Sequence, residues 1–502
     1  MTTGIHHVTA LTADIQANVD FYIGFLGLRL VKRTAGFEDA QQLHLFYGDA
    51  AGSPGSVLSF LAWEGGASGR VGIGQVSEIA FAVPPASIGS WLTRALSARV
   101  PVEGPMRELG ETVLRLKDPD GIIVKLVGAD LPSPAPLGGD APTRIRSVTL
   151  LTDDEAASQQ MLERFGYRPG PRAGAILRMV SESDVIDLRA VAGYVPGIPG
   201  AGTFDHVALR APDRAAVQAA AATLPGEVNM HDRTYFYSLY VRDTAGILYE
   251  YASDTPGFAV NEAPALLGTT LFMPPGASED LEVMLPQFAL PDAERWPRRK
   301  LLFAHRLYTP DAPDDTVLIA LHGSGGSETS LLPLAHRIAP HARLIGLRGR
   351  ATEEGVPRWF RRFGYREFDQ GDIRAEAAAF AAFLPDLAKL YAFDLAQAVF
   401  LGDSNGANFL GAVLRLHPGL VQRAILLRGQ EVLADAPAQA AGSVLMVNGR
   451  LDLLVGPAAG ELEAALRAGG ASVEAVTVAA GHGLAEADAT AARAWLEARR
   501  DS

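Results

Sequence analysis

The 502-residue chain contains no cysteine. Disulfide bonds, thiolate metal ligands and a cysteine nucleophile are therefore excluded, and the absence fits a reducing compartment. No apolar run approaches the ~20 residues that a helix needs to span a bilayer. The first residues lack the basic and apolar regions of a secretory signal peptide. We therefore expect a cytoplasmic protein with no membrane partner.

Positive charge is also scarce. The chain carries 44 Lys and Arg against 57 Asp and Glu, a net charge of −13, and its basic residues form no cluster. Nucleic acid is not an expected partner, because binding phosphates requires a basic surface. Apolar residues make up 48% of the chain, as in folded globular proteins, and the length predicts about three domain-sized units. These features favour a protein that acts on small molecules.

Four short segments of similar pattern recur in the first half of the chain, and each resembles a β-strand in length and composition. They span residues 5–10, 76–81, 145–150 and 204–209. A helix-like stretch and about three further strands follow each segment, and the late strands correspond at 55–59, 121–125, 184–187 and 246–250. A Pro-rich stretch, 131–142, is typical of a linker between two halves. The sequence therefore predicts four βαβββ units over residues 1–251.

Two positions of this repeat carry side chains that can bind metal. The first-strand position holds, in copy order, His7, Glu78, Ser147 and His206. The late-strand position holds, in the same order, Ser59, Lys125, Asp187 and Glu250. A lone histidine in a strand is more often a core residue than a ligand. Histidine in copies one and four, with a carboxylate in the late strand of copy four, favours a metal site.

His7, His206 and Glu250 form a 2-His-1-carboxylate set, which holds non-haem Fe(II) and leaves positions open for O2 and substrate. Copy two would instead place Lys125 beside Glu78, an ion pair. We therefore expect unit one to pack against unit four around a metal, with units two and three forming a metal-free cup. The ligand atoms must lie about 2 Å from one ion, so a separation of His7 and Glu250 above ~6 Å would contradict this arrangement.

The repeat resembles the vicinal-oxygen-chelate superfamily, in which paired units curl around a metal. Local motifs are similar to those of its hydroquinone-type ring-cleaving dioxygenases; they span residues 6–9, 27–32, 44–49, 52–55, 232–236 and 254–258. The resemblance implies Fe(II), with Mn(II) as the alternative, at His7, His206 and Glu250, and O2 as co-substrate. Asp205 departs from the family pattern, in which a second histidine often precedes the fourth-unit ligand. Its charge puts the identity of the substrate in question, and it could orient a ligand imidazole.

The resemblance also implies roles around the metal for His6, Thr9, Arg233 and Tyr240. Arg233 could stabilise an anionic intermediate, and His6 or Tyr240 could move a proton. The alternative interpretations are a surface salt bridge for Arg233 and a core aromatic side chain for Tyr240.

From residue 301 the pattern changes to strands alternating with helices, which predicts a doubly wound, mostly parallel sheet. The expected strands are 317–321, 344–347, 398–401, 424–427, 444–448 and 472–478. The pentapeptide 402–406, Gly-Asp-Ser-Asn-Gly, lies between a strand and a helix, the context of a nucleophile elbow centred on Ser404. The stretch 322–326 resembles an oxyanion loop, so we expect the backbone N–H groups of Ser324 and Asn405 to stabilise an oxyanion.

Asp452 and His482 follow later strands in the order expected of a catalytic acid and base. The alternative is that Asp452 caps a helix and Asp435 is the acid. This region resembles the carboxylesterase and phospholipase branch of the α/β-hydrolases, in which we expect residues 357–362 to lie near the pocket mouth.

The sequence thus predicts an α+β fold of four βαβββ units followed by an α/β-hydrolase. The expected domains are residues 1–130, 143–290 and 300–502. The expected function is bifunctional: an Fe(II)-dependent ring-cleaving dioxygenase for hydroquinone-like aromatics, fused to a serine hydrolase for an ester or acyl substrate, such as the ring-opened product. The alternatives are a metal-independent aromatic- or quinone-binding module or a glyoxalase-type metal isomerase, fused to an esterase. The oligomeric state is left open, with a homodimer as one alternative.

Overall fold

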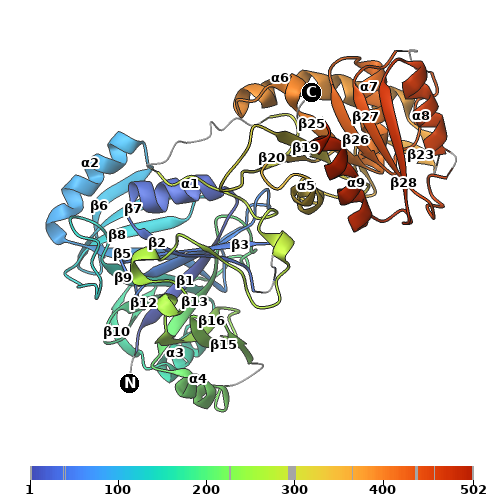
Figure 1. The fold of residues 1–502 in the computed structure, drawn as a ribbon. Helices are drawn as coiled ribbons and strands as arrows, with labels where there is room; N and C mark the ends of the chain where they lie inside the picture. The colour runs from blue at the N-terminus through green and yellow to red at the C-terminus, as the bar shows by residue number, and fades with distance from the viewer. Residues whose placement is uncertain are drawn as a thin grey trace. The chain divides into compact units, whose positions relative to one another are not determined.

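The structure is a computed structural model, shown in Figure 1. It describes residues 3–37, 39, 41–224, 228–291, 301–364, 366–435, 439–456 and 458–499. The chain divides into two compact units. The first comprises Met1–Ala277 and Phe288–Ala293, and the second comprises Ser278–Gln287 and Glu294–Ser502.

The first unit is built from four βαβββ copies, as predicted. The copies contain, in chain order, β1 (Ile5–Thr12), α1 (Ile15–Val19), β2 (Arg29–Ala35), β3 (Leu43–Gly48) and β4 (Val57–Ala62); β5 (Gln75–Val83), α2 (Ile88–Ala98), β6 (Val102–Glu108), β7 (Glu111–Lys117) and β8 (Ile123–Gly128); β9 (Arg144–Thr152), α3 (Glu155–Arg164), β10 (Arg168–Ala173), β11 (Ile176–Val180) and β12 (Val185–Ala190); β13 (Phe204–Ala211), α4 (Arg214–Ala221), β14 (Asn229–Asp232), β15 (Phe236–Arg242) and β16 (Leu248–Pro256). In every copy the first strand pairs in parallel with the last.

Local signals start the helices at equivalent places in three copies. The carboxylates of Asp14, Asp154 and Asp213 are N-caps that each accept a backbone N–H three residues later. Such a cap satisfies a donor that the helix leaves unpaired. The second copy instead enters its helix through a short 3-10 turn, Pro85–Ser87. A π-helical turn, Asp20–Phe25, extends α1.

The copies pair as the ligand pattern predicted. In the nine-stranded sheet β1 lies antiparallel to β13, so copies one and four share a sheet, which the short strand β17 (Leu271–Phe272) extends at its edge. In the eight-stranded sheet β5 lies antiparallel to β9, which joins copies two and three. The prediction that unit one packs against unit four is therefore confirmed.

The cup of copies two and three is filled with ion pairs. Lys125 Nζ lies 2.8 Å from a carboxylate oxygen of Glu78 and 2.8 Å from one of Glu108. Asp187 is paired with Arg178 at 2.8 Å. The predicted ion pair of Glu78 with Lys125 is confirmed, and a cation already occupies the side of the carboxylate where a metal would bind.

The second unit has the doubly wound sheet that the sequence predicted. The strands lie in the order β18 (His305–Tyr308), β20 (Arg343–Leu347), β19 (Val317–Leu321), β25 (Val399–Asp403), β26 (Arg423–Leu427), β27 (Ser443–Gly449) and β28 (Ser472–Val478). All pairings are parallel except that of β18. The bounds differ from the expected ones by at most two residues, because buried β-branched runs mark these strands clearly.

Helices cover both faces of this sheet (Figure 1). One core joins the sheet to α6 (Gln370–Leu390), α7 (Asn405–Leu416) and α8 (Ala458–Ala468), and the other joins it to α5 (Leu332–Ile338) and α9 (Glu486–Glu497). Two small hairpins follow β20: β21 (Ala351–Glu353) with β22 (Val356–Arg358), and β23 (Arg362–Gly364) with β24 (Glu367–Phe368).

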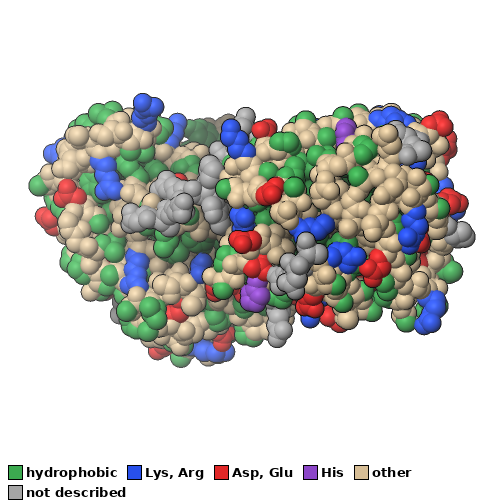
Figure 2. All heavy atoms as spheres, turned by 45° about the horizontal axis from the view of Figure 1, so that its top comes forward, with side chains coloured by type: hydrophobic (Ala, Val, Ile, Leu, Met, Phe, Trp, Pro, Cys, Tyr) green, Lys and Arg blue, Asp and Glu red, His purple; other side chains and the backbone are tan. Residues whose placement is uncertain are grey.

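The charged side chains are mixed on the surface. On the faces seen in Figure 2, Lys and Arg side chains lie among Asp and Glu side chains and do not gather in one area. Among the described residues, no helix is both long and apolar enough to cross a membrane.

Candidate metal centre and candidate catalytic triad

His7, His206 and Glu250 converge in the first unit. They lie on β1, β13 and β16, three neighbouring strands. The Nε2 atoms of both imidazoles are 3.0 Å from Glu250 Oε2 and 3.4 Å from each other. The predicted proximity of His7 and Glu250 is confirmed. Among the described residues this is the one cluster whose ligand atoms could hold a metal ion.

The donor set fits a divalent metal. Glu250 is fully buried, and one of its carboxylate oxygens lies 3.0 Å from the Nε2 atoms of both His7 and His206. Burying a carboxylate is costly, and a cation held among these three side chains would compensate for the lost hydration. Two ligand atoms that each lie about 2.1 Å from one ion at right angles are about 3.0 Å apart. The observed separations therefore match neighbouring ligands of one ion.

A neighbouring side chain contacts the Nδ1 atom of each ligand histidine. His6 Nδ1 lies 2.9 Å from His7 Nδ1, and Asp205 Oδ2 lies 2.6 Å from His206 Nδ1. Such partners fix the orientation of a ligand imidazole and leave its other nitrogen for the metal. Burial lowers the pKa of His6 to about 3, so this imidazole is neutral. Asp205, the departure from the family pattern, therefore lies where it can orient His206.

The surroundings also set the charges of the cluster. Burial opposes protonation of His206, but its contacts with Asp205 and Glu250 raise its pKa to about 9. Burial lowers the pKa of His7. Burial alone would raise the pKa of Glu250, but the two imidazoles hold it well below its usual value. The carboxylate is therefore ionised, as a metal ligand must be.

A hydrogen-bonded chain leads away from the cluster. Thr9 Oγ1 lies 2.9 Å from His206 Nε2 and 2.9 Å from Ser59 Oγ. His44 Nε2 lies 3.0 Å from Ser59 Oγ. Thr9 was predicted as a site residue, whereas His44 and Ser59 were not. Ser59 holds the late-strand position of copy one, so the repeat itself marks this side chain as facing the site.

The cluster opens into a cavity of about 400 Å³. Phe46, Tyr235 and Phe236 form apolar parts of its wall, and Arg233 and Tyr240 line it as well. The Arg233 guanidinium lies 5.8 Å from the Tyr240 ring centre. Burial raises the pKa of Tyr240 well above its usual value, so its hydroxyl is protonated. Thr9, Arg233 and Tyr240 thus face the cavity, while His6 lies behind His7.

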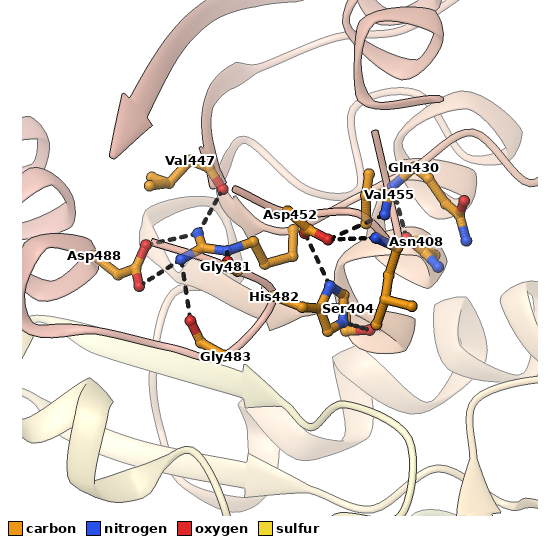
Figure 3. Close-up of polar contacts among 12 residues, drawn as sticks. Ser404, Asn408, Gln430, Val447, Asp452, Val455, Gly481, His482, Gly483 and Asp488 are labelled. Atoms are coloured by element: carbon orange, nitrogen blue, oxygen red, sulfur yellow. Dashed lines mark hydrogen bonds and ion pairs between the residues drawn. The ribbon is translucent and has the colours of Figure 1, made fainter. Parts of the chain in front are cut away.

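A second constellation lies in the hydrolase unit. Ser404 Oγ is 3.0 Å from His482 Nε2, and His482 Nδ1 is 2.9 Å from Asp452 Oδ2 (Figure 3). Ser404 joins β25 to α7, Asp452 follows β27 and His482 follows β28. The nucleophile, base and acid expected from the sequence are therefore within hydrogen-bonding distance of one another.

The turn at Ser404 is strained in the way a nucleophile elbow requires. Its backbone has φ 47° and ψ −110°, which a non-glycine residue rarely adopts. A Cβ at Gly402 would lie 2.7 Å from the backbone nitrogen of Ala407, and one at Gly406 would lie 2.2 Å from the carbonyl oxygen of Leu321. The two glycines of the pentapeptide are therefore needed for close packing.

Asp452 is both a turn cap and the partner of His482. Its Oδ1 accepts the backbone N–H groups of Leu454 and Val455 at 2.9 and 3.2 Å. Burial alone would raise its pKa, but these hydrogen bonds and that of His482 lower it. Asp435, the alternative acid, is exposed, and the imidazole contacts Asp452. The geometry therefore favours Asp452 as the acid.

The expected oxyanion donors belong to the elbow and to the loop after β19. Asn405 is the first residue of α7, and Ser324 lies in the turn after β19. Within the described part of the chain, neither backbone N–H donates to a backbone acceptor. Both remain available to an oxyanion, and the N-terminus of a helix favours negative charge.

The stretch 357–362 carries a buried aromatic pair. Trp359 and Phe360 have exposed fractions of 0% and 1%, and the expected place of this stretch near the pocket mouth stays a prediction. Trp359 Nε1 donates to the carbonyl of His322 at 2.9 Å, and its backbone N–H donates to Asn405 Oδ1 at 2.8 Å. Burial of these apolar rings is favourable. Trp359 thus connects the oxyanion loop to the elbow.

Comparison with known proteins agrees with this architecture. The family model described as Glyoxalase/Bleomycin resistance protein/Dioxygenase superfamily matches residues 4–126. MhqO of Bacillus subtilis, named as a candidate ring-cleaving dioxygenase, is 34% identical over 292 residues, which cover 54% of this chain and 91% of MhqO. The chlorohydroquinone/hydroquinone 1,2-dioxygenase of Sphingobium indicum is 28% identical over 296 residues, 54% of this chain and 91% of that enzyme.

A further relative corresponds to the hydrolase unit. MhqD of Bacillus subtilis, named as a candidate hydrolase, is 34% identical over 190 residues, which cover 36% of this chain and 93% of MhqD. The chain therefore belongs to the glyoxalase, bleomycin resistance protein and dioxygenase superfamily through its first unit, to which an α/β-hydrolase is fused.

Proposed function

We propose that the chain is a bifunctional enzyme, an Fe(II)-dependent ring-cleaving dioxygenase for hydroquinone-type aromatics fused to a serine carboxylesterase. The observation that carries the first activity is the buried set of His7, His206 and Glu250 beside a cavity with aromatic walls. The named activity of the Sphingobium relative supports hydroquinones as the substrate class.

Three side chains would hold the metal, with Mn(II) as the alternative to Fe(II). When bound there, the ion would pass electron density from a phenolate substrate to O2. The overall reaction balances without another reductant, because both atoms of O2 enter the ring-opened product. His6 and Asp205 would keep the two ligand imidazoles in place.

Residues of the cavity wall would bind and orient the substrate. The aromatic ring would pack against Phe46 and Phe236, and the Arg233 guanidinium would attract an anionic oxygen. Tyr240 carries a protonated hydroxyl and can donate a hydrogen bond. Asp205 also lines the cavity, so its charge would disfavour substrates with an acidic substituent on that side.

In the second unit Ser404 would act as nucleophile. His482 would take the hydroxyl proton during attack on an acyl carbonyl and return it to the leaving group, while Asp452 would orient the imidazole. The backbone N–H groups of Ser324 and Asn405 would stabilise the oxyanion. Water would then release the acid by the same steps. The hydrogen-bonding distances from Ser404 to His482 and from His482 to Asp452 support this proposal.

The fusion suggests that the hydrolase processes the ring-opened product. This part of the proposal rests on the covalent link alone. The Ser404→Ala variant, supplied with a hydroquinone and O2, tests this coupling. An altered end product would support hydrolysis of the ring-opened product by the second unit. An unchanged end product would show that the two activities are separate.

Anaerobic reconstitution with Fe(II), followed by oxygen-electrode assays on hydroquinones and catechols, tests the dioxygenase. We expect the iron-loaded chain to take up O2 when a hydroquinone is present. The Glu250→Gln variant should lose both its bound iron and this O2 uptake. Asp187→Asn is the matched control, because Asp187 holds the same late-strand position in copy three and should leave uptake intact. Turnover without O2 would indicate an isomerase instead, and ligand binding that is unchanged in His206→Ala without metal would indicate a binding module.

A further inference from the structure

Arg428 is a buried cation next to the candidate triad. It follows β26 directly, and its side chain is fully buried. Its guanidinium forms a two-pronged ion pair with Asp488 of α9, at 2.7 Å from Nη1 and 2.9 Å from Nη2. Arg428 also has a left-handed backbone, φ 55°.

The remaining donors of Arg428 hold the loop that carries the histidine. Nε donates to the carbonyl of Gly481 at 2.8 Å, and Nη2 donates to the carbonyl of Gly483 at 3.4 Å. Nη1 also donates to the carbonyl of Val447 on β27 at 3.1 Å. All five N–H donors of the guanidinium are therefore used. Two of them donate to the carbonyl groups of the residues on either side of His482.

The backbone of the histidine loop needs support at His482. His482 lies between two glycines, which give the backbone wide conformational freedom, and its side chain is 30% exposed. An Arg–Asp pair buried for stability alone is unusual, because apolar side chains of similar volume would serve as well or better. A function beyond stability would explain why a charged pair is kept here.

The same arginine is connected to the other members of the triad. The residue before it, Leu427, accepts the backbone N–H of Ser404 at 2.8 Å, and the backbone N–H of Arg428 donates to Val447 at 3.1 Å on the strand that leads to Asp452. Asp488 Oδ2 also accepts the backbone N–H of Ala485 at 2.7 Å, which fixes the start of α9 after the histidine loop.

We propose that Arg428 and Asp488 are positioning residues that hold the His482 loop in register with Ser404 and Asp452. The inference rests on the proposed serine hydrolase. Lysine cannot replace Arg428, because its three donors on one nitrogen cannot reach two separated carbonyls and a carboxylate together.

The test uses the full-length chain and p-nitrophenyl acetate as the probe. Ser404→Ala comes first: loss of hydrolysis supports the serine hydrolase, and full hydrolysis refutes that function independently of Arg428. Arg428→Lys and Asp488→Asn should each lower kcat about 100-fold, the size expected when a catalytic group moves by about 1 Å. KM should change little. Arg415→Lys is the control, because it alters the Arg415–Glu431 ion pair (2.6 Å) of the same unit and should leave kcat unchanged.

Two further measurements distinguish positioning from general destabilisation. Labelling of Ser404 by a fluorophosphonate, in which the hydroxyl oxygen displaces fluoride from phosphorus, should slow in parallel with kcat. The low-field proton resonance of the His482–Asp452 hydrogen bond should shift or vanish in both variants but not in Arg415→Lys. Circular dichroism reports folding; if Arg428→Lys does not fold, the isosteric Asp488→Asn decides. A folded variant with wild-type kcat and labelling rate overturns the proposal.

Discussion

Buried titratable side chains dominate both sites at the scale of single residues. Burial raises the pKa of Asp403, the residue before the candidate nucleophile, to about 6 from 3.8. It lowers that of His6 to about 3. In each case burial favours the neutral form. Because burial shifts the pKa values of these titratable side chains, the free energy of unfolding of each unit depends on pH.

Asp403→Asn should stabilise the hydrolase unit at alkaline pH. The folded state binds the proton of Asp403 more tightly than the unfolded chain does, so wild-type stability falls as pH rises from about 4 to about 6 and stays lower above. The amide removes this penalty, by up to about 3 kcal/mol for a shift of about two pKa units. The measurement is the midpoint of thermal loss of esterase activity after heating at about pH 5 and about pH 8. An equal gain at both pH values would contradict the assignment.

Asp205→Asn should weaken metal binding without abolishing it. The carboxylate lies 2.6 Å from His206 Nδ1, and removing such a partner typically costs about 10–100-fold in metal affinity. Equilibrium dialysis with Mn(II), which avoids oxidation of iron, measures the affinity. Asp187→Asn is the control, since Asp187 pairs with Arg178 in the other cup. Unchanged affinity in Asp205→Asn would show that this carboxylate does not support the ligand.

At the scale of elements, the sequence predicted what repeats and missed what depends on tertiary contact. The repeat located His7, His206 and Glu250, because equivalent strands place equivalent side chains in one space. The hydrolase strands were predicted within two residues, because buried runs have a clear pattern. The roles of Trp359 and Arg428 could not be predicted, because partners such as Asn405 and Asp488 lie far away in sequence. His44 was missed because its contact with Ser59 depends on how β3 pairs with β4.

Gly406→Ala should disrupt the elbow and spare the first unit. A Cβ there would lie 2.2 Å from the carbonyl oxygen of Leu321, so β25, α7 or the oxyanion loop must shift. We expect loss of esterase activity and a lower midpoint of its thermal inactivation, with metal content unchanged. The control is Gly460→Ala in α8, where a Cβ meets no atom within 4 Å and alanine favours the helix by about 1 kcal/mol. Wild-type esterase activity in Gly406→Ala would contradict the close packing.

At the scale of the whole molecule, each compact unit carries one candidate site. One sheet of the first unit joins its first and last copies, since β1 pairs with β13, and the other joins its two middle copies, since β5 pairs with β9. The domain limits 1–130, 143–290 and 300–502 stay a prediction, which limited proteolysis around residues 131–142 and 291–300 can test. The metal cluster and the triad share no residue, and each is assembled within its own unit.

The two activities should therefore separate in full-length variants. Ser404→Ala should abolish ester hydrolysis and leave metal content at one ion per chain. His206→Ala should lose the metal and retain wild-type hydrolysis of p-nitrophenyl acetate. The measurements are metal analysis and initial rates on the same preparations. Loss of both activities from either substitution would show that the two units depend on each other.

Turnover of a hydroquinone under ¹⁸O2 tests the central claim most directly. If His7, His206 and Glu250 hold iron for ring cleavage, the Fe(II)-loaded chain should yield a ring-opened product, and mass spectrometry should find both of its new oxygen atoms labelled. Glu250→Gln should yield none. An isomer of unchanged mass, or a product whose new oxygen comes from water, would contradict the account.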